Sequence, residues 1–411
     1  MWCSWPNTLA CQARDRGFES RRPRHNFNQM KLKYLALVSF ISLFGLGCQP
    51  KEKVYRVGIA VPLTGDIAAM GVGMKRGAEL AIEEANKSGR FNLKVELRSF
   101  DDRADPKEAV NVANQIVSDP SIVAVVGHLN SGCSIPAAQV YARNNLLMVT
   151  PAATNPKLTL QQEESSWKWI RNVFRVNTTD DVQGQFAAHY VLKNLKVRTI
   201  CIIHDKTPYG QGLCEEFQKE YESKGGQVLS FEGITTGDKD FKALLTRIKS
   251  QEPDALYFGG IYNEGGLIIK QAREVGLKSL FISGDALQTN EFIKVAGSAS
   301  EGAYITNVGV PPEQIPQAKV FLEAYKAKYP QKDLQPYDHY TYEATNIALL
   351  TLEKAGIQEN GTVDKAKMIE AMRTLKYDGI LGTTEFDEKG DTKNKAISIY
   401  LVKNGQFTTL N

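Results

Sequence analysis

Hydroxyl-bearing residues follow two of the apolar runs in this sequence, where they could hold a small charged molecule. Ser131 comes after the run 123–126, and Thr154 closes the segment TPAAT at 150–154, which follows the run 146–149. Free amides at a helix N-terminus favour an anion, so Ser131 is a candidate for binding a carboxylate. The Thr154 hydroxyl and nearby backbone carbonyls could accept hydrogen bonds from an ammonium group. The simpler alternative, that both hydroxyls only cap helices, stays open at this point.

Two more segments carry residues suited to the same kind of ligand. Tyr209 lies in HDKTPYG at 204–210, and Asp285 lies in SGDA at 283–286; each segment follows an apolar run. The tyrosine could cover a ligand, and Asp285 could pair with its positive charge. Taken singly, each is an ordinary loop residue. The prediction therefore depends on a fold that brings four distant segments together.

Strand and helix patterns alternate from Val54 onward, which predicts an α/β protein. Continuous apolar runs predict buried strands of parallel sheets at 57–61, 122–126, 146–149, 199–203, 255–258 and 280–282. Amphipathic stretches predict the intervening helices at 74–85, 107–117, 135–143, 182–192, 215–221, 241–248 and 265–275. In doubly wound sheets, ligands bind beyond the carboxyl ends of the strands. The four segments lie at such ends.

The length of the chain favours two lobes. About 360 residues follow the N-terminal region, more than one hydrophobic core usually organises. An extended segment at 176–179 is expected to separate two sheets. After a strand at 302–306 the pattern becomes helical, at 316–328, 340–355 and 365–375. The strands 383–387 and 398–402 are expected to form an antiparallel pair across the turn at 388–391.

The N-terminal region has the pattern of an export signal. Residues 30–47 combine two lysines with an apolar run at 34–46 and end just before Cys48. A run of about 13 residues is too short for a transmembrane helix, so we predict a lipoprotein signal peptide with Cys48 as the lipidation site. Plain secretion is the alternative. Residues 1–29 are predicted to be either a spurious leader, translated from an adjacent tRNA gene, or a disordered basic tail.

Charge and motif content argue against several other classes of function. Residues 48–411 hold 43 basic and 44 acidic side chains, so we expect no nucleic-acid partner. The histidines are scattered, no Walker, H-E-x-x-H or G-x-S-x-G motif occurs, and the glycines at 71, 73 and 77 lack the spacing of a dinucleotide loop. Acidic pairs at 101–102 and 180–181 are interpreted as turns and helix caps. We expect no metal, no cofactor and no enzymatic activity. Cys201 and Cys214 could form a bridge or remain buried thiols.

Six segments, taken together and in order, resemble one known family. They are VGIAVPLTGD at 57–66, DDRADPKEAVNVANQIV at 101–117, VVGHLNSGCSIPAA at 125–138, TPAATNP at 150–156, IIHDKTPYGQGL at 202–213 and FDEKGD at 386–391. The chain is similar to the Leu/Ile/Val-binding proteins over residues 55–402. These are type I periplasmic solute-binding proteins that supply amino-acid ABC importers.

The resemblance implies two Rossmann-like doubly wound lobes, joined by three crossover segments, that close on a free amino acid. We expect lobe 1 at 54–177 plus 307–380 and lobe 2 at 178–306 plus 381–411. By position, the resemblance implies that Ser131 and Thr154, with the backbone of Ala152 and Ala153, hold the α-carboxylate and the α-ammonium. It also implies that Tyr209 covers the ligand and that Asp285 pairs with the ammonium.

The side-chain end of the implied pocket departs from the branched-chain binders. The residues expected to set specificity are Met70, Leu129, Asn130, Ile261, Tyr262, Tyr337 and His339. Met70 and Ile261 replace tyrosines of the family, and the segment at 337–339 makes the wall more polar than an aliphatic ligand prefers. Ala104 and Asn130 occupy the places of the family's disulfide.

We interpret the chain as an extracytoplasmic, lipid-anchored protein that captures a neutral or branched-chain amino acid by hinge closure. Its expected partners are the free amino acid, the permease and ATPase subunits of an ABC importer, and the membrane through the N-terminal lipid. One alternative is a ligand-sensing receptor or regulator on the same fold, for an amide or amino acid. A nucleotide-dependent enzyme is a second.

Overall fold

The computed structural model describes residues 54–89, 94–355, 357–358 and 360–410. The chain divides into Met1–Lys51 and Glu52–Asn411, and only the second unit contains described residues. The predictions for the leader, the signal peptide and Cys48 therefore lie outside the described residues. Within the described part, no helix combines the length and the apolar character that crossing a membrane requires.

The first sheet is entirely parallel, with the strand order β2-β1-β3-β4-β5. Its strands are β1 (Val54–Val61), β2 (Lys94–Asp101), β3 (Ile122–Gly127), β4 (Leu147–Thr150) and β5 (Val173–Arg175). Every residue of β3 and β4 is buried, as expected for central strands covered by helices on both faces. The predicted strands at 57–61, 122–126 and 146–149 are thus confirmed.

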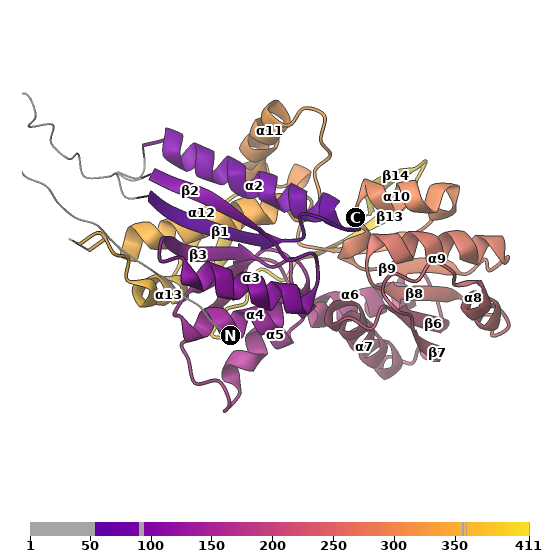
Figure 1. Cartoon of the computed structure of the whole chain (residues 1–411). Helices are drawn as coiled ribbons and strands as arrows, with labels where there is room; N and C mark the ends of the chain where they lie inside the picture. The colour runs from indigo at the N-terminus through magenta and orange to yellow at the C-terminus, as the bar shows by residue number, and fades with distance from the viewer. Residues whose placement is uncertain (1–53, 90–93, 356, 359, 411) are drawn as a thin grey trace, which may run out of the picture. The chain divides into compact units, whose positions relative to one another are not determined.

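Helices cover both faces of this sheet (Figure 1). One face carries α2 (Ala68–Lys87) against α12 (Asp338–Ala355), and the other carries α3 (Pro106–Ser118) and α4 (Ser131–Arg143). The start of α3 shows how sequence fixes a boundary: Asp105 accepts hydrogen bonds from two backbone amides, and Pro106 is the first helical residue. The remaining elements here are α5 (Lys157–Leu160), η1 (Gln161–Glu163), η4 (Pro312–Gln314), η5 (Pro316–Ala318), α11 (Lys319–Lys328) and α13 (Lys365–Arg373).

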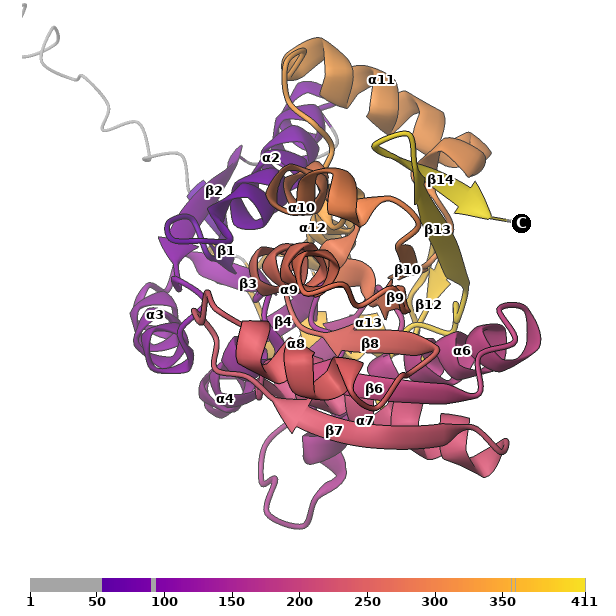
Figure 2. The ribbon, with the colours of Figure 1, turned by 90° about the vertical axis from the view of Figure 1, so that its right-hand side faces the viewer.

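The second sheet has the strand order β14-β13-β10-β9-β8-β6-β7, and it is parallel from β10 to β7. Its strands are β6 (Thr199–His204), β7 (Gln227–Gly233), β8 (Ala255–Gly259), β9 (Leu280–Ser283), β10 (Tyr304–Val308), β13 (Ile397–Lys403) and β14 (Gln406–Leu410). Its helices are α6 (Asp180–Lys193), α7 (Pro208–Ser223), α8 (Lys242–Lys249), α9 (Tyr262–Glu274) and α10 (Asn290–Ala296), with the short turns η2 (Asp285–Leu287) and η3 (Gly297–Ser300). Contacts pair α6 with α7 and α9 with α10 (Figure 2). The predicted α/β architecture with parallel sheets is confirmed.

One strand pairing was predicted wrongly. The strand β12 (Gly382–Glu385) pairs with β11 (Lys376–Gly379), whereas β13 pairs with β10 and β14. Glu343 of α12 explains the difference, because its carboxylate accepts hydrogen bonds from the Ile380 amide (3.0 Å) and the Thr384 hydroxyl (3.1 Å). These bonds hold the β11–β12 hairpin on α12 and away from the second sheet.

Two expected lobe limits also differ from the structure. The Arg175 amide donates to the Gly390 carbonyl (2.8 Å), and the Thr392 amide donates to the Arg175 carbonyl (2.9 Å). Residues 390–392 therefore contact the edge of the first sheet, although we had expected 381–411 in lobe 2. The limit at 306–307 falls inside β10. The division into two lobes is otherwise kept as a prediction.

Cysteines do not bridge in the described part of the chain. Cys133, Cys201 and Cys214 are buried free thiols. The Cys214 thiol donates to the Ile203 carbonyl instead. Cys201 and Cys214 are therefore two buried thiols and do not form the disulfide that the sequence left open.

Candidate functional site

A small cavity collects most of the residues expected to bind a ligand. It is narrow, with about 20 Å³ open to the centre of a water molecule. Its walls are Met70, Leu129, Asn130, Ser131, Ala152, Thr154, Tyr209, Ile261, Ala286 and Tyr337. None of these ten side chains is charged, so the cavity suits a ligand whose side chain is neutral.

Ser131 offers a hydrogen-bond donor at the start of α4. Its buried hydroxyl oxygen accepts a hydrogen bond from the Asn155 amide (3.2 Å), which leaves the hydroxyl proton free to donate. The residue lies inside the helix, and Asn130 is the N-cap. Ser131 is therefore not a simple cap, and its free donor fits a carboxylate.

Thr154 and Ala152 contribute acceptors on the neighbouring segment. Thr154 is buried, and within the described residues its hydroxyl oxygen has no hydrogen-bond partner of regular geometry. The Ala152 carbonyl accepts one hydrogen bond, from Asn177 Nδ2 (3.0 Å), and keeps a second lone pair. Thr154 is not the N-cap of α5 or α6, so the capping alternative fails here too.

Asp285 lies behind two tyrosines that line the cavity. Its carboxylate is fully buried and accepts hydrogen bonds from the hydroxyls of Tyr209 (2.8 Å) and Tyr337 (2.5 Å). Burial raises the pKa of the Asp285 carboxyl, and the bonds from Tyr337 and Tyr209 oppose that rise. The hydrogen bonds from the two tyrosines therefore do not fully offset the cost of burying the charged carboxylate, and a positively charged group beside it would stabilise that form.

The rest of the cavity wall is aliphatic. Met70 comes from α2, Leu129 follows β3, Ile261 precedes α9 and Ala286 follows Asp285 in η2. The sequence analysis did not predict Ala286 as a site residue, because in this segment it selected the charged Asp285.

Three predicted residues lie elsewhere. Ala153 does not line the cavity, and its carbonyl accepts from Arg175 Nη1 (2.9 Å). The Tyr262 hydroxyl donates to the Asp66 carbonyl (2.8 Å). His339 packs against the Tyr340 ring, and burial lowers its pKa to about 3, which keeps it neutral. The wall is consequently less polar than the sequence suggested.

A buried arginine that sequence reasoning missed holds the segment around Thr154. The guanidinium of Arg175 donates to Asp391 Oδ1 (2.8 Å), to the Ala153 and Asn155 carbonyls (2.9 Å each) and to the Thr159 hydroxyl (2.8 Å). The two carbonyls flank Thr154. A lone arginine at a strand end carries no sequence signal of this role.

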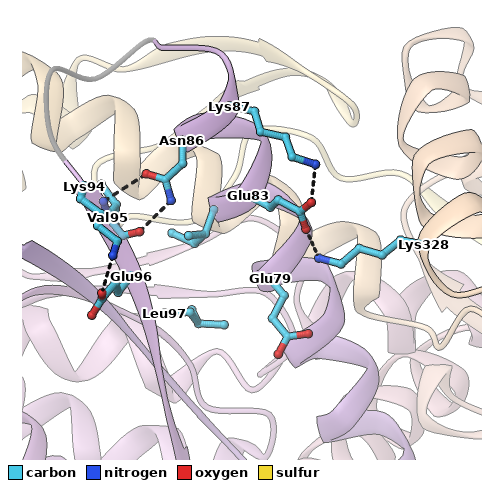
Figure 3. A pocket seen from close by; sticks show the side chains of 10 residues that line it. Glu79, Glu83, Asn86, Lys87, Lys94, Val95, Glu96, Leu97 and Lys328 are labelled. Carbon is cyan, nitrogen blue, oxygen red and sulfur yellow. Dashed lines mark hydrogen bonds and ion pairs between the residues drawn. The ribbon is translucent and has the colours of Figure 1, made fainter.

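A second hollow lies on the surface beside α2 and β2 (Figure 3). Its charged side chains pair with one another: Lys87 and Lys328 both reach Glu83, and Lys94 lies 3.4 Å from Glu96. Asn86 is bonded to the backbone of Val95. The hollow thus leaves fewer free polar groups for a ligand than the cavity around Ser131. In the part of the chain that is described, no cluster of three or more histidine, cysteine or acidic side chains could hold a metal.

Comparison with known sequences gives a consistent result. Residues 54–406 match the model of a family described as periplasmic binding protein. A Leu/Ile/Val-binding protein homolog 1 of Brucella suis is 38% identical over 352 residues, which cover 85% of this chain and 90% of that protein. A leucine-, isoleucine-, valine-, threonine- and alanine-binding protein of Pseudomonas aeruginosa is 36% identical, with coverage of 84% and 89%.

Solved structures with similar folds agree with the sequence matches. A leucine-binding protein of Thermotoga maritima has a TM-score of 0.78 and 31% identity, covering 87% of this chain and 98% of its own. A substrate-binding protein of a branched-chain amino-acid transporter from Streptococcus pneumoniae, in complex with isoleucine, has a TM-score of 0.76 and 25% identity, covering 87% and 100%.

Proposed function

Since the chain belongs to the periplasmic binding protein family, we propose that it captures a neutral aliphatic amino acid outside the cytoplasm for an ABC importer. Members of this family bind solutes and are not enzymes. The observation that carries the proposal is the cavity, where a free hydroxyl donor, unpaired acceptors and a buried acid surround an aliphatic wall.

The polar groups match the two ends of a zwitterion. The Ser131 hydroxyl and the amides at the start of α4 would hold the α-carboxylate. The Thr154 hydroxyl oxygen and the Ala152 carbonyl would accept from the α-ammonium, and the nearby Asp285 would balance its charge. Tyr209 would cover the ligand from the second sheet. Water exclusion strengthens all these contacts.

The aliphatic wall favours leucine, isoleucine or valine over charged amino acids. A lysine or glutamate side chain would bury an unpaired charge among Met70, Leu129 and Ile261, which is strongly unfavourable. A hydroxyl or methyl side chain is tolerated more easily. This agrees with the relative of Pseudomonas aeruginosa that is named for binding leucine, isoleucine, valine, threonine and alanine.

Delivery requires partners that recognise the closed protein. We propose the permease subunits as the direct partner, with cytoplasmic ATPase subunits behind them. We also propose that a lipid on Cys48 tethers the chain to the membrane. Mass spectrometry of the membrane fraction tests the tether, since a lipid-modified N-terminal peptide starting at residue 48 is expected.

Calorimetry tests the ligand class directly. The protein is unfolded and refolded to remove any bound ligand, then titrated with leucine, isoleucine, valine, alanine, threonine, lysine, glutamate and NAD. We expect heat from the aliphatic amino acids and none from lysine, glutamate or NAD. Heat from NAD together with none from any amino acid would contradict the proposal.

A further inference from the structure

Asp180 is a buried acid next to the cavity that the proposed function leaves unused. It is the first residue of α6, and its side chain is fully buried. Among the residues described here, neither carboxyl oxygen of Asp180 makes a hydrogen bond of regular geometry, and the Thr154 hydroxyl makes none either. Buried polar atoms are nearly always paired, so two unpaired groups in one place call for an explanation.

The two unpaired groups are neighbours. The Asp180 amide donates to the Thr154 carbonyl (3.0 Å), which fixes the start of α6 against the segment that ends in Thr154. The Thr154 hydroxyl lies near enough to the Asp180 carboxyl to oppose the rise of its pKa. Thr154 in turn lines the cavity. A small rotation of the hydroxyl would therefore complete a hydrogen bond to Asp180 without disturbing the backbone.

The surroundings of Asp180 are poor in positive charge. Burial raises the pKa of its carboxyl well above the usual range, and the carboxyls of Asp285 and Asp181 raise this pKa further. Thr154 and Arg175 lower it. The titratable groups that face it are Asp181 on α6, Asp285 on η2, Arg175 on β5, Tyr209 and Cys214 on α7, Tyr257 on β8, and Tyr337 before α12. Arg175 is the one cation among them, and it is already bonded to Asp391.

We propose that Asp180 is a positioning residue of the ligand site. Its carboxyl releases a proton to solvent when the ligand's ammonium group binds. The resulting carboxylate then accepts a hydrogen bond from the Thr154 hydroxyl. Thr154 Oγ1 thereby turns a lone pair toward the ammonium. The ammonium replaces the positive charge of the released proton, and the negative charge of the α-carboxylate is held separately by the Ser131 hydroxyl and the amides at the start of α4. The inference rests on the proposed function. It predicts that binding tightens as the pH rises.

Proton release is measured by titrating leucine into the protein in two buffers that differ in ionisation heat, across pH 5–8. Free leucine keeps its charges over this range. For the wild type we expect buffer-dependent heat and an affinity at pH 8 at least tenfold tighter than at pH 5. Glu291→Gln, which removes a surface carboxyl paired with Lys294, should behave like the wild type. Asp180→Asn should lose the buffer dependence and bind at least tenfold more weakly at pH 8.

A double-mutant cycle tests whether Asp180 acts through Thr154. Thr154→Val removes the hydroxyl at nearly constant volume, and adding Asp180→Asn to it should cause little further loss of affinity. Losses of affinity that multiply in the double variant would overturn the positioning role.

Proton release that persists in Asp180→Asn would assign the proton to another group. Absence of release in the wild type would overturn the inference even if Asp180→Asn fails to fold. If the wild type binds no amino acid at all, the proposed function fails and the inference falls with it.

Discussion

At the scale of single residues, the proposed function makes Asp285 the charge on which ligand affinity should depend most. Replacing it with alanine removes the buried partner of the ammonium and leaves the hydroxyls of Tyr209 and Tyr337 without their acceptor. We expect a loss of about 2 to 5 kcal/mol in binding free energy, the range for breaking a buried charge pair. Calorimetry with leucine measures the loss. Glu291→Gln, at a surface acid paired with Lys294, is the matched control and should leave the affinity unchanged. Equal affinities for wild type and Asp285→Ala would remove Asp285 from the site.

Met70 should influence which amino acid is preferred. It is fully buried in the cavity wall, so tyrosine at this position reduces the space for a side chain and adds a hydroxyl. We expect Met70→Tyr to weaken leucine binding about tenfold more than alanine binding, since one or two methylenes are worth about 1 to 3 kcal/mol in such a pocket. Competition titrations give the ratio. Loss of binding for every ligand by a variant that still melts cooperatively would contradict this assignment of the wall.

Sequence reasoning found the residues that line or adjoin the cavity where their place at the end of a strand reveals them. Ser131, Thr154, Tyr209 and Asp285 all follow apolar strands, and the strand ends of α/β sheets are where ligands bind. Asp180 was missed because two adjacent acids at a helix start resemble an ordinary cap. Whether such an acid is exposed or buried against a neighbour depends on tertiary contacts, and the chain order does not reveal these contacts.

Glu343 links α12 to the β11–β12 hairpin, and its titration should make the stability of the folded chain depend on pH. Burial raises its pKa to about 7 from the ordinary 4.5, although the bonds from Ile380 and Thr384 oppose the rise. Between these values the folded chain keeps a proton that the unfolded chain has released. Its contribution to stability is therefore full below pH 4.5 and is lost as the pH rises through 7.

Urea unfolding of wild type and Glu343→Gln at pH 5 and pH 8 tests this effect. Relative to the variant, the wild type should lose about 3 kcal/mol of unfolding free energy over that interval. Asp338 and Asp205, whose pKa values are also raised, contribute equally to both proteins and cancel in the comparison. A constant difference between the two proteins would show that Glu343 does not titrate in this range.

Arg175 connects β5, the segment around Thr154 and the turn that contains Asp391. Arg175→Lys keeps the charge but cannot reproduce a planar guanidinium that serves four acceptors at once. We expect a loss of about 3 to 5 kcal/mol in unfolding free energy, as for other broken buried pairs. The control is Arg171→Lys, at an exposed arginine near Glu163, which should change stability by less than about 0.5 kcal/mol. Similar losses in both variants would refute the buried anchor.

Buried elements were easier to predict from the sequence than half-exposed ones. Central strands such as β3 and β4 read as continuous apolar runs and were predicted from them. The edge strands β2 and β7 are half-exposed, lack such a run and were missed. The partner of β12 could not be inferred, because it depends on the contact between Glu343 and the hairpin, which joins residues 37 to 41 positions apart.

At the scale of the whole unit from residue 54 onward, contacts beside the cavity join the connections of the two sheets. The Tyr262 hydroxyl and Asn263 Nδ2 both donate to the Asp66 carbonyl (2.8 and 3.0 Å), and Asn155 Nδ2 donates to the Pro208 carbonyl (2.6 Å). Under the proposed function, a ligand enclosed between these contacts would bind a closed form better than an open one. Its binding energy therefore stabilises closure.

Thermal unfolding measures this coupling between ligand and fold. A ligand present at 100 times its dissociation constant adds about 2.7 kcal/mol to the folded state, which for a chain of this size corresponds to a rise of about 4 °C in Tm. We expect that rise with leucine and none with lysine, because the aliphatic wall excludes a buried ammonium side chain. Asp285→Ala at the same leucine concentration should shift Tm by about 1 °C or less, since the ligand concentration is then at most about three times the weakened dissociation constant. An equal rise with lysine would place the stabilising site elsewhere on the protein. No rise with leucine, in a protein freed of bound ligand, would contradict leucine binding.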